Sequence, residues 1–201
     1  MRTRLFAIIA SLVFVSACGV NSIPTAEEEA KAKWADVQAS FQRRANLVPN
    51  LVETVRASAA SEQTILTGVT QARADATRIT VTPEQLGDPA AMQRFAEAQS
   101  RLSAAIIPLQ RLQEAYPELR SQQNFATLMQ QLEGTENRIN IAIRDYNEAV
   151  RAYNTEIRTF PSVIGATIIY GSQPMVPYQA VTPGAEVAPT VNFDRPAGNA
   201  Q

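Results

Sequence analysis

The chain has no histidine and only one cysteine, Cys18, among its 201 residues. Without histidine it lacks the commonest general base and metal ligand, and a His-based catalytic triad is excluded. One cysteine can form neither an internal disulfide nor a zinc site built from thiolates. The glycines form no phosphate-binding loop. We therefore expect a protein that is not an enzyme and that needs no cofactor.

Charge and aromatic residues are also scarce. The net charge is −1, only 18% of the residues are charged, and 6% are aromatic. A chain so close to neutrality has no overall field that would attract nucleic acid, so we expect no nucleic-acid partner. The residues that abound are alanine, glutamine, arginine, glutamate and leucine, which favour helix over sheet.

The first eighteen residues have the pattern of an export signal. Two arginines precede an apolar run over residues 5–15, and the run ends in Val-Ser-Ala-Cys at residues 15–18. The run has the length of a signal peptide and is short for a membrane span, which needs about 20 apolar residues. Val-Ser-Ala-Cys resembles the lipobox of bacterial lipoproteins. The resemblance implies a signal peptide over residues 1–17 and lipid on Cys18. The alternatives are an ordinary secretory signal or a short span.

Through an acylated Cys18 the protein would have membrane lipid as a partner. Two or more acyl chains hold a protein stably, and residues 18–24 would then be a short tether in the cell envelope. Gly19 follows the cysteine. In lipoproteins of diderm bacteria an Asp at that place marks retention at the inner membrane. Its absence favours, by resemblance, an outer-membrane protein that faces the periplasm.

Apolar residues recur every seven positions over residues 25–79, which is the pattern of a helix with one buried stripe. Thr25 and Glu28 form a T-x-x-E capping box that predicts the start of this helix. Pro49 lies inside the pattern and removes one helical hydrogen bond. Polar residues also interrupt the stripe after Val55. The pattern leaves open whether this region is one bent helix or two.

Two further stripes predict two further helices. Asp88 is expected as an N-cap, with Pro89 at the first position of a helix that ends before Pro117. The last helix is expected to begin at Ser121 and to stop before Pro161.

Each apolar stripe has to be buried against another, and short connections favour antiparallel neighbours. The sequence therefore predicts an all-α fold, an elongated antiparallel bundle of three to four long helices over residues 25–161. Residues 162–201 are rich in Pro and Gly and predict a non-helical tail that wanders over the bundle or is disordered. The same period also suits a parallel coiled-coil oligomer, but three matching stripes in one chain favour an intramolecular bundle.

Polar residues of the first and last helices form the candidate site. Three interpretations are open: an interhelical polar network, which we favour, a face that binds a partner, and a small-ligand or catalytic site. Arg44 falls on an inner heptad position and needs a carboxylate, for which Glu136 and Asp145 are the candidates. We expect loss of Arg44 to leave a buried carboxylate unpaired. The candidate residues are Arg43, Arg44, Asn46, Asn50, Glu136, Asn137, Arg138, Asp145 and Asn147.

Three stretches resemble a known family. They are FQRRANLVPNLVETV at residues 41–55, YPELRSQQNFATLMQQLEGTENRI at residues 116–139 and RDYNEAVRAYNTEIRTFP at residues 144–161. They are similar to the signature segments of the LemA family. The resemblance implies a membrane-tethered helical bundle that faces away from the cytoplasm, and it implies no particular reaction.

Two functions fit these expectations. The first is a protein-interaction or scaffold module of the cell envelope, which would have a protein partner there. The second is a ligand-binding accessory or sensor subunit of a membrane protease or transport system. The second function needs a pocket between helices, which could open at the kinks expected at Pro49 or Pro108.

Overall fold

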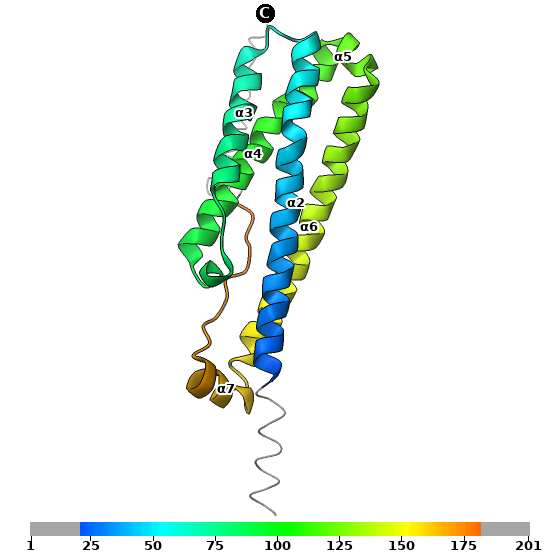
Figure 1. The fold of residues 1–201 in the computed structure, drawn as a ribbon. Coiled ribbons are helices and arrows are strands. Elements are labelled where there is room, and N and C mark those ends of the chain that lie inside the picture. Colours follow the sequence, from blue (N-terminus) through cyan, green and yellow to red (C-terminus); the bar gives the residue numbers. More distant parts are fainter. Residues whose placement is uncertain (1–20, 182–201) are drawn as a thin grey trace, which may run out of the picture.

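The computed structural model describes residues 21–181, and the regular secondary structure in this range is all helical, as predicted (Figure 1). The predicted signal peptide, Cys18 and residues 182–201 lie outside the described residues. Two short helical segments, η1 (Pro83–Gln85) and η2 (Ala166–Tyr170), accompany the α-helices. The α-helices are α2 (Ser22–Ser58), α3 (Gln63–Arg78), α4 (Pro89–Ala115), α5 (Pro117–Ser121), α6 (Gln123–Glu156) and α7 (Ser162–Gly165).

The two longest helices, α2 and α6, lie side by side and run in opposite directions (Figure 1). At a rise of about 1.5 Å per residue, each is roughly 50 Å long. α3 packs against α4, and this pair joins the first mainly through contacts between α2 and α3. The region over residues 25–79 is thus two helices, which settles the question that the heptad pattern leaves open.

The heptad stripes form two buried apolar clusters, one at each end of the molecule. Near the start of α2 the core is aromatic. The centre of the Trp34 ring lies 5.3 Å from that of Phe95 and 5.0 Å from that of Tyr146. The Trp34 indole N–H donates to the carbonyl of Val81 at 2.9 Å. The cluster at the far end is built from aliphatic side chains and Phe125. Arg44 lies in α2 between Phe41 of the first cluster and Ala45 of the second.

The helix ends differ in part from the predicted ones. α2 begins at Ser22 rather than Thr25, and the Thr25 hydroxyl donates to the Asn21 carbonyl at 2.9 Å instead of accepting a bond as an N-cap. The predicted capping box is therefore wrong, and residues 22–24 of the expected tether are helical. Pro24 fits there because N–H groups of a first helical turn have no partner inside the helix.

Of the two later helix starts, that of α4 agrees with the prediction and that of α6 does not. Asp88 accepts a hydrogen bond from the Ala90 N–H at 2.9 Å and caps α4, as predicted. The last long helix begins at Gln123, not at Ser121. Pro117 starts the short helix α5 instead, and the Ser121 hydroxyl donates to the Glu118 carbonyl within it at 2.9 Å.

The tail is helical in its first part, so the prediction of irregular structure from residue 162 onward is wrong there. α7 and η2 span residues 162–170. Gly171 has a φ of 58°, the left-handed conformation that favours glycine, and ends this segment. Residues 171–181 have no regular secondary structure, yet Met175 and Tyr178 are buried in the aromatic cluster.

Candidate functional site

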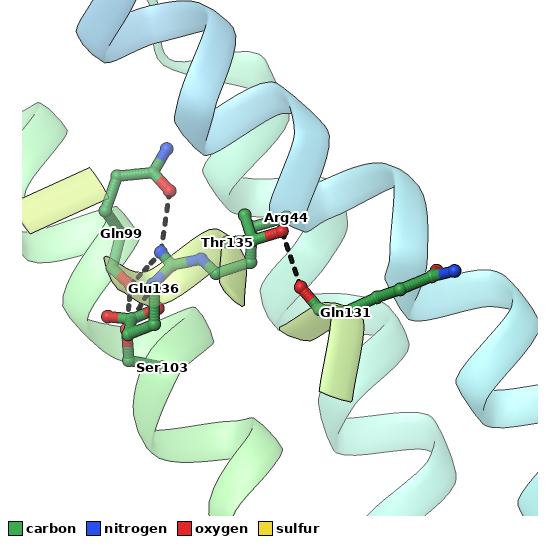
Figure 2. A network of polar contacts seen from close by, with 6 residues as sticks. All are labelled: Arg44, Gln99, Ser103, Gln131, Thr135 and Glu136. Atoms are coloured by element: carbon green, nitrogen blue, oxygen red, sulfur yellow. Dashed lines mark hydrogen bonds and ion pairs between the residues drawn. The ribbon is translucent and has the colours of Figure 1, made fainter. Parts of the chain in front are cut away.

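Arg44 is the centre of a polar cluster inside the fold (Figure 2). Only 1% of this residue is exposed. Its Nη1 donates to Ser103 Oγ at 2.6 Å and to Glu136 Oε2 at 3.2 Å. Its Nη2 donates to both the backbone carbonyl and the side-chain Oε1 of Gln99, each at 3.0 Å. One guanidinium therefore joins α2, α4 and α6.

The charge of this cluster is unevenly buried. The Arg44 side chain is 2% exposed, whereas that of its partner Glu136 is 49% exposed. Burial lowers the pKa of Arg44, and the nearby Glu136 carboxylate opposes that shift. A guanidinium stays protonated in proteins even so. Arg44 is therefore a fixed positive charge between two apolar clusters, and its carboxylate partner remains in contact with solvent.

The surroundings of Arg44 hold its partners in place. The Gln99 amide donates to the Ala76 carbonyl of α3 at 3.2 Å, which fixes the side-chain oxygen toward Arg44. The guanidinium carbon lies 5.0 Å from the centre of the Phe41 ring, within the range of a cation–π contact. Arg44 Nε has no hydrogen-bond partner among the described residues.

Of the nine candidate residues in the helices, the structure joins only Arg44 and Glu136 to each other. Asp145 is half-buried, and its Oδ1 lies 3.4 Å from Nη2 of its chain neighbour Arg144. Asn147 contacts the tail, as described below. The remaining five are exposed and lie outside the Arg44 cluster: Arg43, Asn46, Asn50, Asn137 and Arg138.

Sequence reasoning missed Gln99 and Ser103. These residues are four apart in α4, so they share one face of that helix. Gln99 is buried beside a stripe that includes Phe95 and Leu102. The sequence does contain a signal, because Gln99 follows Phe95 by four residues and precedes Leu102 by three, so its amide falls on the apolar stripe and requires a partner.

A second polar arrangement holds the tail against α6. Asn147 and Asn154 are seven residues apart, and each side-chain amide bonds both backbone groups of one tail residue. Asn147 donates to the Tyr178 carbonyl at 3.0 Å and accepts from the Tyr178 N–H at 2.8 Å. Asn154 donates to the Met175 carbonyl at 2.8 Å and accepts from the Met175 N–H at 2.9 Å. We call this pair the asparagine clamp.

Two tyrosines of α6 extend the clamp. The Tyr146 hydroxyl donates to the Val176 carbonyl at 2.9 Å, and that of Tyr153 donates to the Gln173 carbonyl at 3.1 Å. On the other side of the segment, the Val176 N–H donates to the Leu86 carbonyl at 2.8 Å. The tail backbone is thus bonded on one side to α6 and on the other to the connection that precedes α4.

The side chain of Tyr178 fills the space between the helices. Its ring centre lies 5.9 Å from that of Phe41 and 6.4 Å from that of Phe95. Burial raises its pKa to about 12. The tail therefore occupies the space between α4 and α6 as an extended segment, with its backbone paired and one aromatic anchor buried.

Beyond the described tail this space continues as two pockets. A pocket of about 160 Å³ is lined by Tyr178, Val181 and the Arg44 cluster. A larger pocket of about 330 Å³ shares Arg44, Ser103 and Glu136 with it, and adds apolar walls from both helices. We call the two together the α4–α6 groove. The apolar walls of the larger pocket are Ile106, Ile107 and Leu132.

The described residues lack two features that other functions would need. None of the described helices is both long and apolar enough to cross a membrane. The described residues also hold no group of three or more His, Cys, Asp or Glu side chains that could bind a metal ion.

A model of the LemA family matches residues 33–193, which is most of the chain. The chain belongs to the LemA family. No curated protein matches it. In this LemA protein the matched region contains the Arg44 cluster, the asparagine clamp and the residues that line the α4–α6 groove.

Proposed function

We propose that this LemA protein is a lipid-anchored interaction module of the cell envelope, and that it binds an extended segment of a partner protein in the α4–α6 groove. The observation that supports this most is the asparagine clamp. The space between these helices already accommodates an extended polypeptide, the chain's own residues 173–178, mainly through backbone hydrogen bonds.

Contacts of this kind suit peptide recognition. Hydrogen bonds to backbone groups supply affinity for any extended segment, and pockets for alternate side chains supply specificity. Past Val181 the groove offers an apolar pocket walled by Ile106, Ile107 and Leu132 beside the polar atoms of Ser103. The Arg44 charge is already satisfied by Glu136 and two α4 residues. The partner segment that fits therefore places an apolar side chain in this pocket and needs no carboxylate for Arg44.

The chain offers a matched pair of positions for the test. Ile107 is 46% exposed and lines the groove, whereas Ile141 is 43% exposed and lines none of the pockets described here. A photo-crosslinking amino acid at each position is activated in native membranes, and the crosslinked peptide is sequenced by mass spectrometry. We expect a crosslink from position 107 to one segment of one envelope protein, with an apolar side chain at the crosslinked site, and none to that segment from position 141.

The crosslinked segment is then synthesised, and its binding to the purified protein is measured by fluorescence anisotropy. Ile107→Glu should weaken binding at least tenfold, because it places a charge in the apolar pocket. Equal capture at both positions would contradict the proposal. A crosslink from position 107 to residues 182–201 of the same chain would also contradict it, because the groove would then be filled from within.

The anchor is the second element of the proposal. Lipid on Cys18 would hold the protein at a membrane, the outer membrane facing the periplasm if the source is a diderm bacterium. The mature protein should begin at an acylated Cys18 by mass spectrometry, and Cys18→Ser should abolish both cleavage and acylation. An unmodified thiol, or another N-terminus, would refute the anchor.

One observation favours a second candidate, a ligand-binding accessory or sensor subunit of a membrane protease or transport system. The larger pocket lies next to Pro108, and its volume of about 330 Å³ is within the range of small-molecule sites. If this function is correct, protein purified from native membranes should carry one small molecule in stoichiometric amount. Ile106→Trp, which fills the pocket, should remove that molecule.

A further inference from the structure

Exposed apolar side chains are concentrated in one short segment. Seven large apolar side chains are exposed in the described part of the chain, and five of them lie within residues 160–170. We call these five the apolar patch. They are Phe160 at 81% exposed, Ile164 at 52%, Ile168 at 78%, Ile169 at 62% and Tyr170 at 42%. Contiguous exposed apolar surface on a protein marks a site of interaction.

The segment that carries the patch has no charge. From Thr159 to Val181 the sequence contains no Asp, Glu, Lys or Arg. A charged side chain that enters the hydrocarbon of a bilayer has a high energetic cost, so an uncharged segment can enter without it. Tyrosine is enriched at the membrane–water interface, since its ring is apolar and its hydroxyl is polar. The composition of the patch therefore suits a lipid surface.

The fold places the patch at the end of the molecule where α2 begins (Figure 1). Ser22, the first residue of α2, and Ser162, the first residue of α7, each donate a hydrogen bond to Glu156 Oε1 at 2.5 Å. α7 also packs against α2. These two bonds lower the pKa of Glu156, which keeps it ionised as their common acceptor. The patch is thus fixed beside the start of α2.

We infer that the apolar patch inserts into the membrane surface and forms a second contact with it, beside the lipid anchor. This inference rests on the proposed anchorage at Cys18. Only three residues separate Cys18 from Ser22, and four residue steps span at most about 14 Å. A membrane that holds Cys18 therefore lies within reach of the patch. The same is true if the apolar run over residues 5–15 is not cleaved and stays in the membrane.

The second contact fixes the orientation of the protein. An acyl anchor alone acts as a flexible joint, whereas a patch on the folded part prevents free rotation of that part. With the patch in the interface, α2 and α6 extend away from the membrane, and their far ends, next to α5, are the most distant (Figure 1). The α4–α6 groove is then held clear of the membrane, where a partner segment can reach it.

Tryptophan quenching by brominated lipid tests this contact. The chain has one tryptophan, Trp34, and it is 1% exposed, so it gives a constant background. Ile168→Trp adds a tryptophan inside the patch. Ile141→Trp adds one at an exposed isoleucine of α6 outside it, as the matched control. Both full-length proteins are reconstituted in vesicles of phosphatidylethanolamine and phosphatidylglycerol, with or without bromine on the acyl chains.

We expect brominated lipid to cause about a twofold loss of the added fluorescence in Ile168→Trp, because interfacial elements place their apolar side chains about 5–10 Å deep. Ile141→Trp should show no loss beyond that of the wild type. Flotation of the vesicles separates the two proposals. Protein that floats, with unquenched Ile168→Trp, would overturn the patch inference and leave the anchorage standing. Protein that does not float would overturn both.

Discussion

Replacing Gln99 should destabilise this protein more than replacing Glu136, although only Glu136 carries a charge. In Gln99→Leu, one N–H of the buried Arg44 guanidinium loses its acceptor, and the Ala76 carbonyl loses its donor. A buried polar group without a partner costs about 1–3 kcal/mol, and a charged group costs more. The expected loss in free energy of unfolding is therefore about 3 kcal/mol.

Glu136→Ala removes a weaker interaction. The bond from Arg44 is 3.2 Å long, and the carboxylate is 49% exposed, so solvent screens the ion pair. Arg44 keeps its hydrogen bonds to Ser103 and to both oxygens of Gln99. An exposed pair contributes about 0.2–1 kcal/mol, and we expect a loss of that size. The expectation that loss of Arg44 strands a buried carboxylate is wrong for the same reason, since the half-exposed Glu136 can be hydrated.

Urea unfolding followed by Trp34 fluorescence measures these differences. A double-mutant cycle of Arg44→Met with Gln99→Leu should give a coupling of about 1–2 kcal/mol, and the cycle with Glu136→Ala about 0.5 kcal/mol or less. Arg43→Ala, at the exposed neighbour of Arg44, is the control and should change stability by less than about 0.5 kcal/mol. If Glu136→Ala costs as much as Gln99→Leu, burial does not govern this cluster and the reasoning fails.

The remaining predictions concern the tail. Asn154→Leu leaves both backbone groups of Met175 unpaired and should lower the free energy of unfolding by about 2–4 kcal/mol, measured by thermal unfolding. Asn140 lies fourteen residues earlier at an exposed position of the same heptad row, and Asn140→Leu should change that free energy little. Equal losses would refute the clamp. Removal of residues 180–201 should leave the melting temperature nearly unchanged, because the last clamped residue is Tyr178; a large drop would contradict this. Because burial raises the pKa of Tyr178 to about 12, the unfolded state loses this proton at a lower pH than the folded state. The free energy of unfolding is therefore unaffected by Tyr178 below about pH 10 and falls as the pH rises toward about 12. Tyr178→Phe should reduce that alkaline loss in urea melts, and an identical pH dependence would show that this tyrosine does not titrate as proposed.

The sequence alone determined the helical class and the positions of the buried stripes. Trp34, Phe41, Val48 and Val55 follow one another at intervals of seven, and all four are buried in the structure. The sequence also identified Asp88 as the N-cap of α4. These features depend on residues close together in the chain, because helical periodicity and capping are local properties. The heptad position of Arg44 likewise indicated an inner place, and 1% of the residue is exposed.

Only the tertiary structure decided which groups meet. Gln99 and Ser103 are 55 and 59 residues from Arg44, and Glu136 is 92 residues away. Periodicity marks which face of a helix is buried, but it does not say which neighbour covers that face. Asn147 and Asn154 could have joined two helices by their spacing, and instead they bind the tail backbone. An extended segment that is paired through backbone groups leaves no periodic signal of its own, because every residue carries the same N–H and C=O.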